Sequence, residues 1–189
     1  MGKFDGKVAL VTGAGRMRGI GRAAAMAFAQ EGADVTVTGT GRDPESFPDD
    51  EKAAGWRDID SVADEITGLG RGSLALVVDV TKEAQVQDAV ERTVAQFGRI
   101  DFLVNNASAP RMAAWAQLEE LTEEAWHTVM DIKVTGAFLC TKAVVQALLS
   151  QGHGGSIVNV ISVEAKISRA NDLAYATASG ALATFTHKA

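Results

Sequence analysis

Two hydroxyl-bearing residues in the C-terminal part of the chain have the spacing of a proton-transfer pair, because Tyr175 follows Ser162 by thirteen positions. A phenol donates a proton well to the oxygen of a carbonyl group under reduction if its pKa of about 10 is lowered toward neutrality. A serine hydroxyl can hydrogen-bond the same oxygen. Together with a phosphate cradle elsewhere on the same domain, the pair would indicate nicotinamide-dependent chemistry between a carbonyl and an alcohol.

A glycine-rich turn near the start of the chain has the composition of a phosphate cradle. Residues 12–21 read TGAGRMRGIG and lie between a short apolar run and an alanine-rich segment at residues 22–30. Glycines in a turn from strand to helix permit close approach of a pyrophosphate to the helix N-terminus. The turn is not a P-loop, and it misses the strict GxGxxG pattern because Arg18 occupies the sixth position from Gly13. Its candidate cofactor-binding residues are Gly13, Gly15, Arg16, Arg18, Gly19, Ile20 and Gly21.

The elements that must position these groups alternate along the chain. Apolar runs at residues 8–11, 35–38, 74–78, 102–104 and 157–161 are typical of strands covered on both faces. Between them, residues 59–69 and 86–97 carry apolar side chains at helical spacing. This alternation predicts one α/β domain, 1–189, with a parallel sheet and helices on both of its faces. Residues 39–56, with two prolines and several acids, are predicted to form a surface loop.

These motifs resemble the short-chain dehydrogenase/reductase family, whose cofactor turn reads TGxxxGxG. Thr12-Gly13 and Gly19-Ile20-Gly21 match that turn, with two extra residues between them. Two further matches, an acid that contacts adenine and the NNAG element, are Asp79-Val80 and Asn105-Asn106-Ala107, with Ser108 in place of the last glycine. The likeness covers the whole chain.

The resemblance implies a Rossmann-type doubly wound sheet with strand order 3-2-1-4-5. Members of the family normally continue with two further strands and with helices that close over the substrate, so we expect this chain, which ends at Ala189, to lack them and to expose its fifth strand as an edge. The family also associates through the helices that carry Lys133 and Tyr175 here. The resemblance therefore implies a homodimer or homotetramer.

Two positions depart from the family's catalytic pattern. The lysine expected four residues after the tyrosine is Ser179, and the asparagine expected on the preceding long helix is Lys133. Lowering the pKa of a phenol by three units represents roughly 4 kcal/mol, which a serine hydroxyl cannot supply. Lys133 shares a helical stripe with Trp126, Met130, Ala137 and Cys140, so it is predicted to face the interior. One hypothesis is that its ammonium replaces the missing charge beside Tyr175; the alternative is that it extends to the surface or pairs with an acid.

Cofactor preference depends on the end of the second strand, where Gly39 stands in place of an acid that would hold the adenosine ribose. The groups that could meet a 2′-phosphate are Thr40, Arg42, Arg16 and Arg18. They favour NADP over NAD. The alternatives are that these arginines are ordinary solvated charges and that Asp43 reaches back to the ribose.

The composition narrows the class of protein. A net charge of −6 without basic clusters argues against nucleic acid or an anionic membrane as a partner. The single cysteine, Cys140, excludes an intramolecular disulfide, and no leader or uninterrupted membrane-spanning apolar run is evident, so we expect a cytoplasmic protein. His127, His153 and His187 are too scattered in sequence to predict a metal site.

Two classes of function remain open on the sequence. The first is an NAD(P)-dependent oxidoreductase that interconverts a ketone and a secondary alcohol on a small-molecule substrate. The second is a catalytically silent dinucleotide-binding module, which Ser179 and Lys133 favour. A hydrolase is disfavoured because Ser162 has no histidine partner at a recognisable spacing, and a methyltransferase would leave the spacing of Ser162 and Tyr175 unexplained.

Overall fold

Five parallel strands form the centre of the protein. The computed structural model describes residues 2–167 and 171–189, and within them the sheet has the order β3-β2-β1-β4-β5. This confirms the predicted topology. The strands are β1 (Val8–Val11), β2 (Asp34–Gly39), β3 (Ser73–Val77), β4 (Phe102–Asn105) and β5 (Ser156–Asn159).

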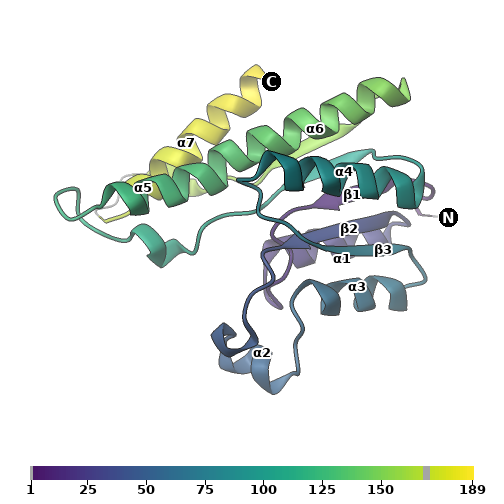
Figure 1. Ribbon diagram of the computed structural model, residues 1–189, viewed down its shortest axis with the longest axis horizontal. Coiled ribbons are helices and arrows are strands. Elements are labelled where there is room, and N and C mark those ends of the chain that lie inside the picture. Colours follow the sequence, from purple (N-terminus) through teal and green to yellow (C-terminus); the bar gives the residue numbers. More distant parts are fainter. Residues whose placement is uncertain (1, 168–170) are drawn as a thin grey trace.

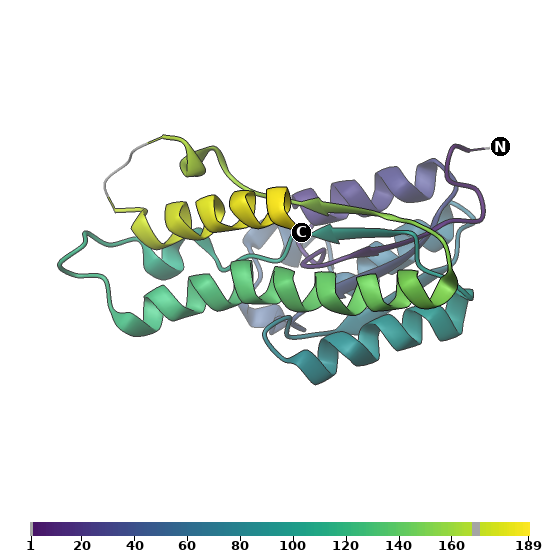
Figure 2. The same cartoon turned by 90° about the horizontal axis from the view of Figure 1, so that it is seen from above.

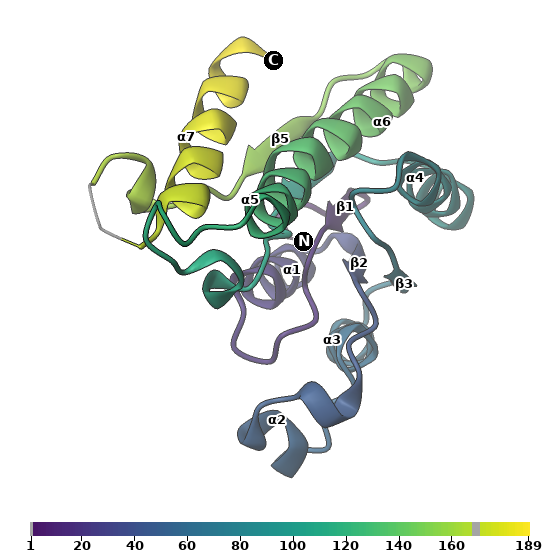
Figure 3. The same cartoon turned by 60° about the vertical axis from the view of Figure 1, so that its left-hand side comes forward.

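Helices cover both faces of this sheet, as Figures 1 and 3 show. On one face, α1 (Ile20–Gln30) and α3 (Ile59–Gly68) pack their apolar stripes against β1, β2 and β4. On the other face, α4 (Glu83–Phe97) and α6 (Gly136–Gln151) bury Val90, Cys140 and Val144 against Leu10 and Leu103. Each strand end therefore lies in a fixed position between two layers of helices, which positions the loops that follow the strands.

One long helix spans residues 123–151 and changes its winding in the middle. It consists of α5 (Glu123–Met130), a π-helical segment η3 (Asp131–Thr135) and α6. Figure 2 shows it running alongside α7 (Leu173–Lys188), which contacts both α5 and η3. By length and composition this helix could cross a membrane, although charged residues interrupt its apolar sequence, and such a match is weak evidence because core helices also satisfy it. Its burial of Cys140 and Val144 under the sheet is typical of a core helix.

The segment between β2 and α3 is more ordered than the surface loop predicted for residues 39–56. It contains a 3₁₀ turn, η1 (Pro44–Ser46), and a short helix, α2 (Asp49–Ala53). Glu51, which lies in α2, is only 3% exposed. Two more 3₁₀ turns, η2 (Arg111–Ala114) and η4 (Val163–Ala165), follow β4 and β5. The loop prediction missed α2 because prolines and clustered acids normally indicate an open turn.

Strand β5 lies at one edge of the described sheet, as expected, and ends at Asn159, two residues before the end of the predicted run. Val158 is 49% exposed, so the prediction that this strand is covered on both faces is wrong for the described residues. The shorter strand leaves Val160 and Ile161 in the loop, where both line the main cavity.

Candidate active site

A cavity of about 1020 Å³ opens at the carboxyl ends of the strands. The glycine turn after β1 forms one side of it, and the segments that follow β3 and β4 contribute Asp79, Val80, Asn106 and Ala107. Tyr175 and Lys133 line the same cavity. Ligands of doubly wound folds bind at this edge of the sheet.

Hydrogen bonds join the glycine turn to the end of β4. Thr12 Oγ1 accepts hydrogen bonds from the amides of Asn106 (3.0 Å) and Ala107 (3.1 Å), and Asn106 Nδ2 donates to the carbonyls of Thr12 and Gly13 at 2.9 Å each. Gly13 has a φ of +65°, and a Cβ added there would lie 2.7 Å from Ala107 Cα. The close approach of the two loops therefore requires glycine at position 13.

Helix α1 begins at the cavity with its amides available to an anion. Its N-cap is Gly19, no side chain caps it, and no acidic residue lies in its first turn. Gly19 and Ile20 line the cavity, so an anion held there would meet the positive end of the helix. Gly21 has a different role, because a Cβ there would lie 2.5 Å from Asn106 Nδ2 and would push the helix from the β4 loop. These features fit the pyrophosphate of a dinucleotide.

Lys133 lies in the π-helical segment η3 with its side chain in the interior, as the sequence predicted. It is 2% exposed, its Nζ donates to the Val160 carbonyl at 3.2 Å, and the same Nζ lies 4.9 Å from the centroid of the Tyr175 ring. Burial lowers the pKa of Lys133. The alternative, in which Lys133 extends to the surface or pairs with an acid, is not seen in the described part of the chain. π-Helical turns occur frequently at functional sites.

The other predicted catalytic residues lie in less direct positions. Ser162 caps η4, where its Oγ accepts a hydrogen bond from the Glu164 amide at 3.2 Å, and it does not line the cavity. Ser179 is fully buried in α7, and its Oγ has no hydrogen-bond partner among the described residues. The structure therefore brings Tyr175 together with Lys133 at the cavity, whereas Ser162 and Ser179 do not line it.

The basic residues predicted to receive a 2′-phosphate are arranged differently from the expectation. Arg42 donates to Asp58 Oδ1 from Nε (3.2 Å) and Nη2 (3.0 Å) and to Glu51 Oε2 from Nη1 (2.9 Å). Arg18 pairs with Asp50 at 3.1 Å and does not line the cavity. Arg16 and Thr40 are exposed and line it. Arg42 also lines the cavity, but its guanidinium is paired with two carboxylates, so it is neither the free partner predicted for a 2′-phosphate nor the ordinary solvated charge of the alternative.

Asn105 also differs from its prediction as a cofactor-binding residue. Its side chain is buried, and its Nδ2 donates to Asn159 Oδ1 (2.8 Å) and Thr141 Oγ1 (3.0 Å). It joins β4 to β5 and α6 and does not line the cavity. The sequence placed it correctly at the strand end, but alternation of side chains along the strand turns Asn105 into the core and Asn106 toward the cavity.

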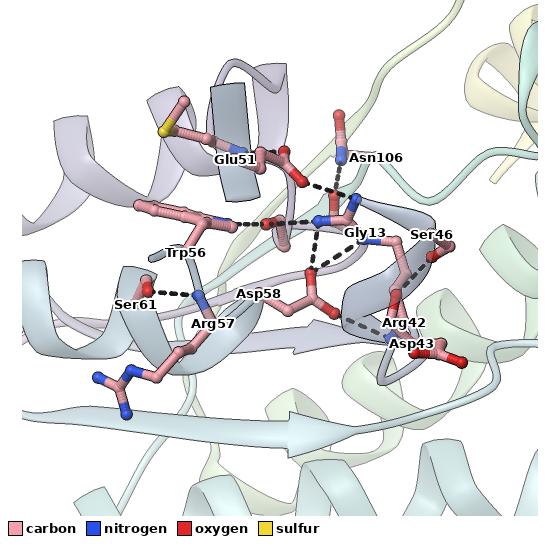
Figure 4. Close-up of polar contacts among 12 residues, drawn as sticks. Gly13, Arg42, Asp43, Ser46, Glu51, Trp56, Arg57, Asp58, Ser61 and Asn106 are labelled. Carbon is pink, nitrogen blue, oxygen red and sulfur yellow. Dashed lines mark hydrogen bonds and ion pairs between the residues drawn. The ribbon is translucent and has the colours of Figure 1, made fainter. Parts of the chain in front are cut away.

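Sequence reasoning missed Glu51 and Asp58. Both are buried acids beside the glycine turn, and Figure 4 shows their carboxylates on either side of Arg42. An aspartate directly before the apolar stripe of α3 is a usual helix-start signal, so Asp58 was detectable as an element boundary. Nothing in the local pattern indicates that its carboxylate turns to the cavity. Within the described residues, no group of three potential metal ligands lies close enough to hold a metal ion.

Known proteins resemble this chain over almost its whole length. A sequence model of the short chain dehydrogenase family matches residues 7–189. An uncharacterized oxidoreductase of Methylorubrum extorquens is 38% identical over 182 residues, which are 96% of this chain and 65% of that protein. An uncharacterized NAD-dependent oxidoreductase of Mycobacterium tuberculosis is 35% identical over 98% of this chain and 66% of its own length. The chain thus spans slightly less than two thirds of these relatives.

Solved structures agree with the sequence matches. NAD⁺-bound xylitol dehydrogenase superimposes with a TM-score of 0.84 at 33% identity, covering 98% of this chain and 64% of that one. Carveol dehydrogenase from Mycobacterium avium in complex with NAD gives 0.83 at 31% identity, covering 98% and 65%. The glycine turn, the strand order and these matches lead to one conclusion: the chain belongs to the short-chain dehydrogenase family.

Proposed function

We propose that the chain is a nicotinamide-dependent oxidoreductase that interconverts a ketone and a secondary alcohol, with Tyr175 as the acid and base and Lys133 as its cation. The observation that carries this proposal is the position of the Lys133 ammonium, buried and 4.9 Å from the centroid of the Tyr175 ring at the cavity. The NAD bound to two structural neighbours and the NAD dependence given for the M. tuberculosis relative support the cofactor class.

The residues that would hold the dinucleotide follow from the lining of the cavity. The amides at the start of α1, near Gly19 and Ile20, would hold the pyrophosphate, and Asp79 and Val80 lie where the resemblance places adenine. The Asn106 side chain holds the glycine turn in place through Thr12 and Gly13. A bound nicotinamide supplies or accepts the hydride.

The chain's own residues then handle the proton. During reduction, the Tyr175 hydroxyl donates its proton to the oxygen of the former carbonyl, and during oxidation the phenolate takes the proton back. Lys133 stabilises the phenolate electrostatically, and its burial limits the screening of that charge by water. The Val160 carbonyl, 3.2 Å from Nζ, restrains the ammonium in this position. Lys133 thereby supplies the charge that Ser179 cannot.

A silent dinucleotide-binding module is the second candidate. The observation that favours it is that Ser179 stands where the family's catalytic lysine is expected. Ser179 is buried, its hydroxyl is unpaired among the described residues, and it cannot bind a ribose from there. A module of this kind would bind a dinucleotide without exchanging hydride.

Turnover separates the two candidates. We would measure absorbance of the reduced nicotinamide with a panel of secondary alcohols and ketones, with both nicotinamide cofactors, for the wild type and Tyr175→Phe. The proposal expects turnover in the wild type and a loss of about 10²-fold or more in Tyr175→Phe, with dinucleotide affinity retained. Binding without turnover across the panel would identify the silent module instead.

A further inference from the structure

Asp58 adopts a backbone conformation that aspartate normally avoids. Its φ of +56° and ψ of −131° lie outside the regions that residues with a Cβ populate freely. Such a conformation costs roughly 1–3 kcal/mol and persists where the surroundings enforce it, frequently at ligand sites. The conformation therefore calls for a reason in the surroundings of the side chain.

The Asp58 carboxylate does not serve the helix that it precedes. Asp58 is the N-cap of α3, yet its side chain makes no capping hydrogen bond. It instead accepts from the Arg42 amide at 3.2 Å and from the Arg42 guanidinium at 3.0 and 3.2 Å (Figure 4). Asp58 also lines the main cavity. An aspartate at an N-cap ordinarily accepts from the helix amides, which contributes about 1 kcal/mol. The Asp58 carboxylate therefore faces the cavity instead of the amides of α3.

The Asp58 carboxylate lies close to the end of β2, where Gly39 has no side chain. A Cβ added at Gly39, the end of β2, would lie 3.6 Å from Asp58 Oδ2, and a Cβ at Gly15 would lie only 1.6 Å from Oδ1. A side chain at the end of β2 would meet Ile59 Cγ2 first, at 2.8 Å, and would come into van der Waals contact with the carboxylate of Asp58. Glycine at both positions leaves room for it.

The neighbouring charges make this corner of the cavity negative. Arg42 lies between Asp58 and Glu51 and also donates to the Gly15 carbonyl at 3.1 Å, while Glu51 Oε1 accepts from the Met17 amide at 2.8 Å. Arg42, Asp58 and Glu51 together carry a formal charge of −1, which repels a phosphate, whereas the exposed Arg16 is the cation of the glycine turn that lines the same cavity. A carboxylate has about four lone-pair positions, of which three accept from Arg42 here, so one stays available to a hydroxyl.

We propose that Asp58, held by Arg42, accepts a hydrogen bond from the adenosine ribose and excludes a 2′-phosphate, so that the chain selects NAD over NADP. This inference rests on the proposed function and reverses the preference that the arginines indicated in the sequence. Arg42 acts as a positioning residue for the carboxylate, and Glu51 pairs with the same guanidinium and adds the second negative charge.

Binding of the adenosine half alone tests the inference without any redox readout. Isothermal titration calorimetry would compare ADP-ribose with 2′-phospho-ADP-ribose on the wild type, Asp58→Asn and the control Asp60→Asn, an exposed aspartate in the first turn of α3 that does not line the cavity. In the wild type, ADP-ribose should bind about tenfold or more tightly than the 2′-phosphorylated ligand, equivalent to about 1.4 kcal/mol. Asp58→Asn should remove most of this difference in affinity between the two ligands, and Asp60→Asn should preserve the difference.

A second variant covers the case in which Asp58→Asn does not fold, as judged by circular dichroism. Glu51→Gln keeps Asp58 and removes one of the two carboxylates beside Arg42. The ratio of the affinities for the two ligands should fall by at least about threefold, because Arg42 becomes available to the 2′-phosphate. An unchanged ratio of the two affinities in every variant that folds would overturn the role of Asp58, Arg42 and Glu51 in cofactor selection.

The remaining outcomes distinguish the inference from the function on which it rests. Equal or tighter binding of 2′-phospho-ADP-ribose to the wild type would overturn NAD selection and leave the oxidoreductase proposal intact. If neither ligand, nor NAD or NADP, binds the wild type, the proposed function fails and the inference fails with it.

Discussion

The Lys133 ammonium lies 4.9 Å from the centroid of the Tyr175 ring, although the two residues are 42 positions apart in sequence. They come together because η3 and α7 pack against each other beside the end of β5. The distance places a cation against the face of an aromatic ring, an arrangement that the ring quadrupole favours. The same contact brings a positive charge beside the aromatic ring that carries the Tyr175 hydroxyl.

The first prediction concerns the pH dependence of turnover. Burial lowers the pKa of Lys133, so its ammonium loses the proton at a lower pH than an ordinary lysine. If the cation supports Tyr175, kcat/KM should fall as pH rises through that lowered pKa. Lys133→Arg should move this alkaline decline to higher pH, since guanidinium stays protonated. A decline that is identical in both proteins would show that another group titrates.

The second prediction concerns substitutions at Lys133 and Ser179, the two positions that depart from the family's catalytic pattern. Lys133→Asn should reduce turnover by about 10²-fold or more, because it removes the cation beside Tyr175. Adding Ser179→Lys, which restores the arrangement implied by the family resemblance, should recover at least part of that activity. Steady-state rates of the single and double variants, with dinucleotide affinity measured in parallel, would test this. Full activity in Lys133→Asn alone would rule out the relocated cation.

The third prediction concerns the stability cost of the buried cation. Lys133 has a lowered pKa in the folded protein, so the unfolded chain binds more protons between the two pKa values and stability should rise with pH across that interval. Lys133→Met should remove this slope and raise the free energy of unfolding at neutral pH by about 1 kcal/mol, or about 2–4 °C in Tm.

The control for this stability change lies on the same long helix. Lys142 is half-exposed and pairs with Glu83 at 2.8 Å, so Lys142→Met should change the free energy of unfolding by less than about 1 kcal/mol in the opposite direction. Urea titrations over a range of pH would compare the variants. A destabilised Lys133→Met would mean that the ammonium stabilises the fold, contrary to this prediction.

The fourth prediction separates backbone strain from steric contact in the glycine turn. Gly13 and Gly98 have φ angles of +65° and +77°, but an added Cβ meets Ala107 only at Gly13, and at Gly98 it meets nothing within 4 Å. Gly98→Ala should therefore destabilise by about 1 kcal/mol from the backbone alone. Gly13→Ala should lower the free energy of unfolding by clearly more than Gly98→Ala does, and it should weaken dinucleotide binding. Equal costs in urea denaturation would show that the β4 loop moves aside freely.

The family resemblance also implies association through the long helix, and the structure leaves apolar side chains exposed there, including Phe138 and Leu149. We expect a dimer or tetramer at micromolar concentration by light scattering. Phe138→Glu should favour the monomer, whereas the matched change Leu69→Glu at the end of α3 should not. A monomeric wild type would contradict this expectation.

Much of the architecture was readable from local patterns. Apolar runs such as residues 8–11, the helical stripes at residues 59–69 and 86–97, and the glycine turn after the first strand predicted the elements, and the family motifs implied their order. The inward orientation of Lys133 was also predictable, because it shares the period of its apolar neighbours. These features depend on spacing along one element, which a sequence displays directly.

The partners of the charged side chains were decided only by the tertiary structure. Arg42 looks like a free loop cation in the sequence, and Asp58 looks like a helix cap, yet folding of residues 39–58 against the glycine turn pairs them at 3.0 Å. Asn105 and Asn106 are neighbours in one motif, but the strand turns one into the core and the other to the cavity. Periodicity determines which face of an element a residue occupies, whereas charge pairing depends on which distant segment the fold brings to that face.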